Sequence, residues 1–232
     1  MTHFNWTQLI HGVEHHHIHI ATGVLTTLLI TILSIVGFVS IKATKGNPAP
    51  SGKFNVRGVF EFITEFIVGL VDTVIGKHGR IFVPFFCALF TYILLNNLVG
   101  LVPGMTPATD NINTTAAIGL VSFILYNFLG IKEHGVVSYL KHFMGPIIWL
   151  APLMLVIELI SHLVRPLSLG MRLAGNMTGD HTVLGVFLDL VPAWMPVPVI
   201  FYGLGLFVCL VQAFVFTLLS MVYVSMAVAH DH

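Results

Sequence analysis

The sequence predicts an all-α integral membrane protein with about five transmembrane helices and one amphipathic surface helix, the last two spans being long and tilted. Of its 232 residues, 56% are hydrophobic and only 9% are charged, whereas a soluble domain carries about 25% charged residues. The mean hydropathy is +0.93, and several apolar runs reach the roughly 20 residues that a membrane-spanning helix needs. We therefore interpret the whole chain, residues 1–232, as a single membrane domain.

Residues 1–20 are expected to form an external N-terminal segment that is rich in histidine. The histidines of this patch are His11, His15, His16, His17 and His19. Their spacing mixes both faces of a helix, which favours a solvated or interfacial terminus over a metal site. A role in metal binding stays open as the alternative, and we expect no bound metal or cofactor.

Residues 21–41 form an uninterrupted apolar run and predict the first span. A polar connection with glycine, proline and basic residues follows. Residues 54–75 then place Glu61, Glu65 and Asp72 at spacings of four and seven among apolar positions. This pattern favours an amphipathic helix at the membrane surface over a span.

Residues 80–102 predict the second span, with Asn96 and Asn97 towards its end. A loop with turn residues, one acid and no base leads into the third span at residues 114–131. A polar segment of about ten residues then precedes the second half of the chain.

Residues 146–190 stay apolar for longer than one perpendicular helix can cross a bilayer. A strong tilt, a kink near Pro166 or a break is therefore required, and periodicity does not choose among them. After a proline-rich turn, residues 199–229 supply a final span that also needs to tilt.

The basic residues predict the orientation of the chain. All those outside the fourth span fall in connections on one side of a five-span topology, and that side is expected to be cytoplasmic. The N-terminus would then lie outside and the C-terminus inside, in a bacterial inner membrane.

A polar stripe crosses the fourth span. Its members recur at spacings of three, four, seven or eight, which places them on one helix face: Glu158, His162, Arg165, Arg172, Asn176 and Asp180. At 1.5 Å per residue the stripe is about 33 Å long, roughly one hydrocarbon thickness. An arginine at the depth of Arg172 costs about 3 kcal/mol or more in lipid, so it is expected to face water or a partner. A structural arginine, satisfied by backbone carbonyls or by Glu158, is the alternative.

Glycine and glutamine accompany this stripe. Gly170, Gly175 and Gly179 would let another helix approach closely, either within the chain or from an external partner. Gln212 in the last span needs a hydrogen-bond partner, for which the polar stripe and a neighbouring backbone carbonyl are both candidates.

Two segments carry a family resemblance. RPLSLGMRLAGNMTGDH, followed by QAFVFTLLSMVYVSMA, resembles subunit a of the bacterial F-type ATP synthase. NNLVGLVPG and the PATDNINTT loop match the same family in order, so the resemblance covers roughly residues 20 to 229.

This resemblance implies a proton-translocating stator in the membrane sector, which offers two half-channels to a rotating ring of c subunits. Arg172 matches the essential family arginine, which favours the ionised ring carboxylate and prevents a short circuit between the half-channels. Glu158 matches the glutamate of the cytoplasmic exit, and the remaining matches line the interface: Arg165, Ser168, Asn176 and Gln212. The implied partners are the c ring, the b-subunit peripheral stalk, the rest of the complex and the lipid bilayer.

The chain departs from the family pattern at two places. His181 stands where many relatives have glutamate, and Asp180 precedes it where glycine is common. Gly205 stands where some relatives carry histidine. Asp180 and His181 could form the outer relay pair, since histidine titrates near neutral pH, or they could cap the helix end.

Other functions are predicted less well by these residues. A secondary ion transporter or channel is the alternative, but it would often show two similar halves, and no convincing repeat is present. The sequence lacks a GxxxxGK[ST] phosphate loop and an HExxH motif, so we expect no nucleotide or metal catalysis by this chain. Balanced charge gives no support for a nucleic acid partner. Whether the ion is H⁺ or Na⁺ stays open.

Overall fold

The computed structural model describes residues 18–43, 56–102, 104–136, 139, 151–190 and 197–228. Most of the N-terminal histidine patch and the turn at residues 191–196 lie outside these described residues. Within them the chain is helical and has no strand. The predicted all-α class is confirmed.

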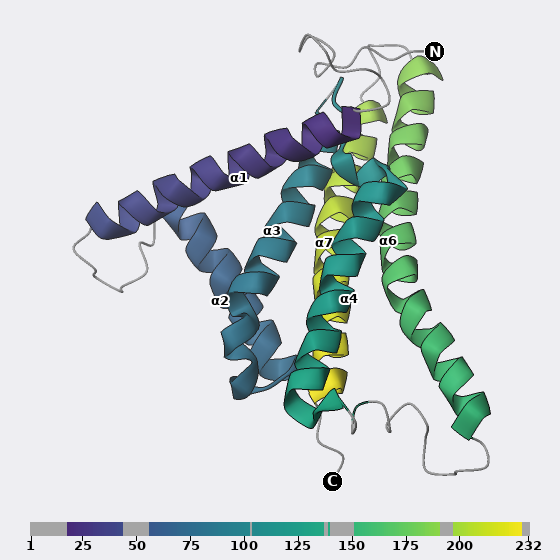
Figure 1. Cartoon of the computed structure of the whole chain (residues 1–232). Coiled ribbons are helices and arrows are strands. Elements are labelled where there is room, and N and C mark those ends of the chain that lie inside the picture. The colour runs from purple at the N-terminus through teal and green to yellow at the C-terminus, as the bar shows by residue number, and fades with distance from the viewer. Residues whose placement is uncertain are drawn as a thin grey trace.

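Within the described residues, five helices are long and apolar enough to cross a membrane, as the sequence predicts. The elements, in chain order, are α1 (Ile18–Ala43), α2 (Val56–Val74), the 3₁₀ helix η3 (Lys77–Phe82), α3 (Val83–Gly100), the 3₁₀ helix η4 (Ala108–Asp110), α4 (Ile112–His134), α6 (Ala151–Leu190) and α7 (Val197–Val228). Figure 1 shows α3, α4, α6 and α7 as the main bundle, with α1 inclined across its upper end and α2 beside α3. Upper and lower refer to this view.

α1 contacts the bundle through threonines. Thr22 and Thr26 are fully buried, while most large apolar side chains of this helix are exposed. The Thr26 hydroxyl donates to Oδ1 of Asn96 in α3 at 2.9 Å. α1 thus combines a small polar contact with an apolar surface suited to lipid.

α2 is amphipathic and is not among the five candidate spans. Its buried face includes Ile67 and Val71, and its end is tied to η3 by Arg80, which donates to both carboxylate oxygens of Asp72 at 2.8 and 2.6 Å. These hydrogen bonds lower the pKa of Asp72. The location of α2 at the membrane surface stays a prediction.

The core lies between α3, α4 and α7, where apolar side chains from all three helices meet. Phe86, Ile93, Tyr126, Phe216 and Met221 are each at most 2% exposed. On α7 the buried positions recur at helical spacing, at Cys209, Gln212, Ala213, Phe216, Thr217, Ser220, Met221 and Val224. This stripe fixes the rotation of α7, and it includes Gln212.

α6 packs closely on α4 through small residues. A Cβ added at Gly119 of α4 would lie 2.7 Å from the backbone oxygen of Pro166. A Cβ at Gly170 would lie 3.1 Å from backbone atoms of Ala116 and Thr115. Glycine at position 119 is therefore needed for this approach of the two backbones, and position 170 leaves little room for a side chain.

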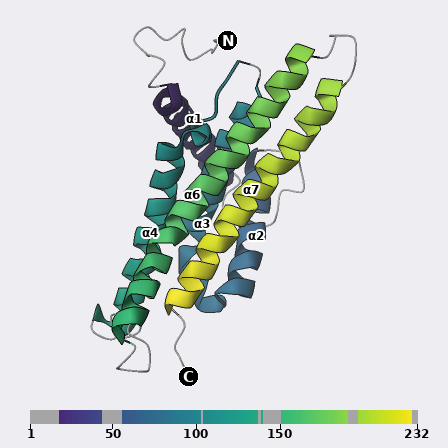
Figure 2. The same ribbon diagram turned by 90° about the vertical axis from the view of Figure 1, so that its right-hand side faces the viewer.

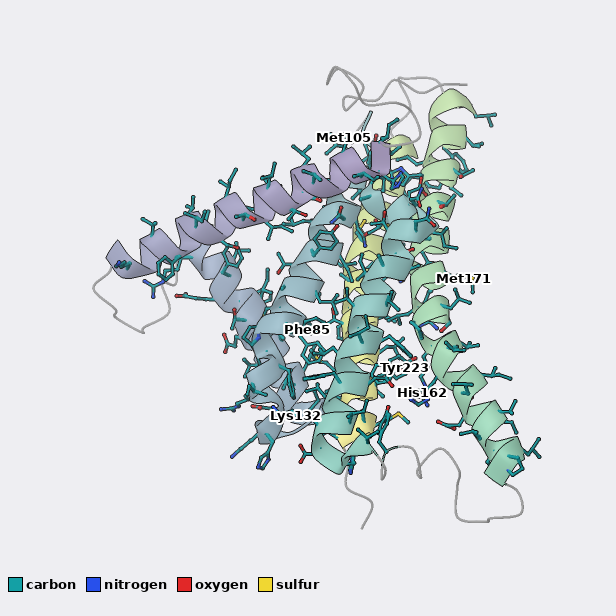
Figure 3. All side chains as sticks on the ribbon, viewed as in Figure 1. Phe85, Met105, Lys132, His162, Met171 and Tyr223 are labelled. Carbon is teal, nitrogen blue, oxygen red and sulfur yellow. The ribbon has the colours of Figure 1, made fainter. Side chains whose placement is uncertain are left out.

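α6 is a continuous helix of 40 residues with Pro166 inside it. At 1.5 Å per residue it is about 60 Å long, twice the hydrocarbon thickness. Figure 3 shows a bend between the labelled residues His162 and Met171, the segment that contains Pro166, which lacks an amide hydrogen and clashes with the preceding turn. Among the three options left open by the sequence, the helix is bent and unbroken. Figure 2 shows α7 lying beside it.

Candidate functional site

The polar residues of α6 fall into three levels along the helix. Glu158, His162 and Arg165 lie in its lower part, Arg172 lies near the middle, and Asp180 and His181 lie in its upper part. From Glu158 to Arg172 the rise is about 21 Å, and from Arg172 to Asp180 it is about 12 Å. The two outer groups are therefore separated by the arginine.

The lower polar cluster consists of Glu158, His162 and Arg165 of α6, Tyr126 of α4 and Tyr223 of α7. One carboxylate oxygen of Glu158 lies 3.5 Å from His162 Nδ1 and 3.6 Å from an Arg165 guanidinium nitrogen. The Arg165 guanidinium also lies 5.5 Å from the centre of the Tyr223 ring, a cation–π contact. Figure 3 shows His162 and Tyr223 facing the same space between α6 and the bundle.

Arg172 is exposed. Among the described residues none forms a hydrogen bond or ion pair with it. An ion pair between Arg172 and Glu158 was one alternative from the sequence. Glu158, however, lies about 21 Å away along the helix and interacts with Arg165 and His162. Within the described chain Arg172 thus lacks a counter-charge.

About one helical turn above Arg172, a side-chain hydrogen bond links α6 to α7. Asn176 Nδ2 donates to Oε1 of Gln212 at 2.7 Å, and Gln212 is 4% exposed. Gln212 therefore has a partner in the polar stripe, one of the two candidates from the sequence. Ser168, by contrast, makes a local bond, its hydroxyl donating to the Arg165 carbonyl at 3.0 Å.

The upper polar cluster consists of Asp110 of η4 with Thr178, Asp180 and His181 of α6. The Thr178 hydroxyl donates to the Asp110 carboxylate. Asp180 and His181 are half-buried. Titratable groups from two separate segments thus meet at the upper end of the bundle.

Asp180 and His181 are adjacent in sequence but face different helices. A Cβ at Gly205 of α7 would lie 2.7 Å from Oδ2 of Asp180. A Cβ at Gly100 of α3 would lie 2.6 Å from Nε2 of His181. The Asp180 carboxylate therefore occupies the space that a side chain at position 205 would need.

The three glycines of the stripe have different surroundings. Gly170 faces the backbone of α4, whereas Gly175 and Gly179 have nothing within 4 Å of an added Cβ. Within the described chain, a close neighbour therefore explains the lack of a side chain at Gly170 but not at Gly175 or Gly179.

Two features of the site were not predicted from the sequence. Asp110 had one available signal, since it is the acid in a loop without bases, but its contact with Thr178 spans 68 residues. The role of Tyr126 and Tyr223 in enclosing the lower cluster had no sequence signal, because aromatic residues are common in apolar helices.

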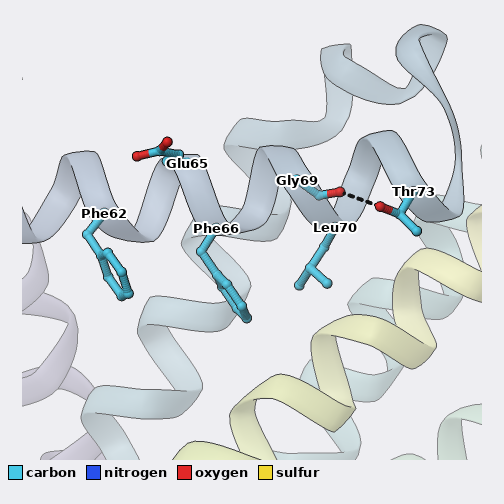
Figure 4. Close-up of a pocket in the computed structure, with 6 residues that line it drawn as sticks. All are labelled: Phe62, Glu65, Phe66, Gly69, Leu70 and Thr73. Atoms are coloured by element: carbon cyan, nitrogen blue, oxygen red, sulfur yellow. Dashed lines mark hydrogen bonds between the residues drawn. The ribbon is translucent and has the colours of Figure 1, made fainter.

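No other candidate site competes with these clusters in the described part of the chain. Among those residues no group of three histidine, cysteine, aspartate or glutamate side chains could hold a metal ion. Figure 4 shows a pocket along α2, lined by Phe62, Glu65, Phe66, Gly69, Leu70 and Thr73. All six belong to one helix, and Glu65 is the only charge among them.

The comparisons with known proteins agree on one family. The family model described as ATP synthase A chain matches residues 23–225. The chain is 58% identical over 229 residues to ATP synthase subunit a of Bdellovibrio bacteriovorus, covering 99% of each chain. It is 45% identical over 207 residues to ATP synthase subunit a of Geotalea daltonii, covering 89% of this chain and 87% of that one.

Proposed function

Because this chain belongs to the ATP synthase A chain family, we propose that it is the stationary, proton-translocating subunit beside a rotating ring of c subunits. The family assignment confirms the resemblance noted in the sequence and makes the chain a membrane-sector subunit of ATP synthase. The ring, the half-channels and the individual residue roles are the proposal. We also infer that the chain catalyses no phosphoryl transfer itself.

The observation that carries the proposal is the exposed charge of Arg172. A guanidinium stays protonated in proteins, and a charge at this depth is costly in lipid. Since the described chain offers Arg172 no acid, the counter-charge would come from outside. A carboxylate on each passing c subunit would supply it, and a nearby cation lowers the pKa of a carboxylate.

The surroundings of Arg172 suit a helical partner. Apolar side chains beside it are exposed, such as Leu167 at 50% and Met171 at 48%. Gly175 and Gly179 have open space beside them, which would allow a c-subunit helix to approach closely. These features favour the external partner over packing within the chain.

The two polar clusters are proposed as parts of the two half-channels. The upper polar cluster would serve the outer half-channel, with Asp180 and His181 as relay groups, and the lower polar cluster the inner one, with Glu158 at its exit. A proton would cross between them only by riding the ring, because the positive charge of Arg172 repels a proton passing directly. Asn176 and Gln212 would hold the helix surfaces together above the arginine.

The orientation follows from basic residues at the lower end. Lys77 and Arg80 precede α3, and Lys132 lies in the last turn of α4. Figure 3 shows Lys132 at the lower end. We infer that this end is cytoplasmic, in a bacterial inner membrane, with the N-terminus outside. The peripheral stalk formed by b subunits is proposed as a further partner, without an assigned contact residue.

The test is ATP-driven proton pumping by the complete complex in inverted vesicles. Arg172→Ala is compared with the unmodified complex at equal assembly, and passive proton leak is recorded in the same vesicles. We expect pumping to be lost and leak to increase, because the ring carboxylate loses its counter-charge and the barrier between half-channels is removed. Normal pumping at normal assembly would reject the proposal.

A further inference from the structure

His162 is a titratable side chain inside the lower polar cluster. It is 9% exposed, although histidine is usually only partly buried. It lies one helical turn above Glu158, about 6 Å closer to the level of Arg172. Its place is therefore between the proposed exit and the arginine.

The charged and titratable groups around His162 come from three helices. On α6, its Nδ1 lies 3.5 Å from a Glu158 carboxylate oxygen, and that oxygen also contacts Arg165. On α4, the Tyr126 ring lies edge-on to the imidazole, with 5.8 Å between ring centres. On α7, the Tyr223 ring lies 5.9 Å from Tyr126 and beneath the Arg165 guanidinium.

Tyr139, which follows α4, is a further described neighbour of this cluster. Its hydroxyl donates to Oδ1 of Asn127 at 2.9 Å. A phenol in water ordinarily titrates near pH 10. Among the described side chains that enclose this space, imidazole is thus the one whose ordinary pKa lies nearest neutrality.

Resting on the proposed function, we propose that His162 exchanges protons with Glu158 in the cytoplasmic half-channel. In the direction of ATP synthesis, a proton reaching the neutral imidazole through water forms an imidazolium ion. Its N–H bond at Nδ1 breaks as an O–H bond forms on Glu158, which leaves a neutral imidazole and a carboxylic acid. Glu158 then releases the proton to water at the cytoplasmic end, and pumping reverses these steps.

Arg165 has a positioning role in this arrangement. Its guanidinium lies against the same Glu158 oxygen and the Tyr223 ring, so it holds the carboxylate beside the imidazole. Its guanidinium keeps a fixed positive charge beside the carboxylate. The cluster can therefore accept a proton on one group and lose it from the next.

The experiment measures ATP-driven pumping by the complete complex in inverted vesicles, whose outer face is the cytoplasmic one, between about pH 5.5 and 8. His162→Gln keeps a polar side chain that cannot titrate. His78→Gln is the matched control, since His78 is exposed in η3 at the lower end. Arg172→Ala is measured in parallel.

We expect His162→Gln to slow pumping at least about tenfold. This is less than the roughly hundredfold or greater loss usual for a proton-transferring group, because water can replace the imidazole in part. We also expect the pH profile to lose the inflection due to the titrating imidazole, while His78→Gln leaves rate and profile unchanged. An unchanged rate, or a lower rate with the profile retained, would overturn the role of His162. If Arg172→Ala abolishes pumping at the same time, the proposed function survives that failure.

A second variant separates proton transfer from packing. His162→Ala opens space beside Glu158, and added imidazole is expected to restore pumping in these vesicles. A merely structural histidine would not be replaced by a free base in this pH-dependent way. Absence of rescue in an assembled complex would count against the proposal.

Discussion

Substitution of Gly205 by alanine tests whether the Asp180 carboxylate is part of the proton path. An alanine Cβ at this position would lie 2.7 Å from Asp180 Oδ2 and 2.7 Å from Leu101 Cδ2. Both distances are about 0.7 Å or more short of van der Waals contact. Because the two neighbouring atoms are ends of side chains, the helices can stay in place while the carboxylate moves.

The expected cost is small for the fold and larger for function. Turning the Asp180 side chain away from its preferred rotamer costs about 0.5–1.5 kcal/mol, and alanine in a helix recovers up to about 1 kcal/mol relative to glycine. Assembly should therefore be nearly unchanged. If the displaced carboxylate raises the barrier to proton transfer by about 1 kcal/mol, pumping falls about fivefold.

Gly203→Ala is the matched control, two residues away on the same helix, because nothing lies within 4 Å of its added Cβ. ATP-driven pumping in inverted vesicles is normalised to the amount of assembled subunit. Asp180→Asn supplies the background in which Gly205→Ala should cause little further loss, since both changes act on one group. Equal pumping by Gly205→Ala and Gly203→Ala would refute the reasoning.

Two further substitutions test the packing around the site. Gly119→Ala puts a Cβ 2.7 Å from a backbone oxygen of α6. Because a backbone cannot turn aside, we expect the stability to fall by about 1–3 kcal/mol, measured as reduced assembly and thermal stability. Gly185→Ala, whose Cβ meets nothing within 4 Å, is the control and should be tolerated, and equal stability of the two variants would contradict this packing. Asn176→Leu and Gln212→Leu remove the same 2.7 Å hydrogen bond, so the double variant should lose less than the sum of the single ones, with a coupling of about 0.6–1.7 kcal/mol. SDS-induced unfolding of the purified chain measures this coupling, and strict additivity would show that the two amides act independently.

The sequence by itself determined the all-α membrane class, and it singled out Arg172 for testing. Lipid cannot hydrogen-bond a backbone, and an α-helix satisfies its own backbone groups, so helical spans are long apolar runs that are visible in composition alone. Charge is costly in the same environment, which makes Arg172 and the stripe around it stand out. The family resemblance rested on these residues, and it was confirmed.

Only the tertiary structure decided which side chains meet. Helical spacing places Glu158, His162 and Arg165 on one face, but it does not show that two tyrosines from other helices enclose them. Nor does it show that Asp180 faces Gly205 or that His181 faces Gly100. These contacts depend on how closely the helices approach, where they cross and how each is rotated.

The physical reason is that helix crossings are set by packing across the whole bundle. The approach of Gly119 to the Pro166 carbonyl, and of Gly170 to Ala116, brings α6 onto α4. The buried stripe of α7 fixes its rotation, so that Gln212 meets Asn176. Periodicity describes one helix at a time, whereas the site is formed by side chains from four segments of the chain.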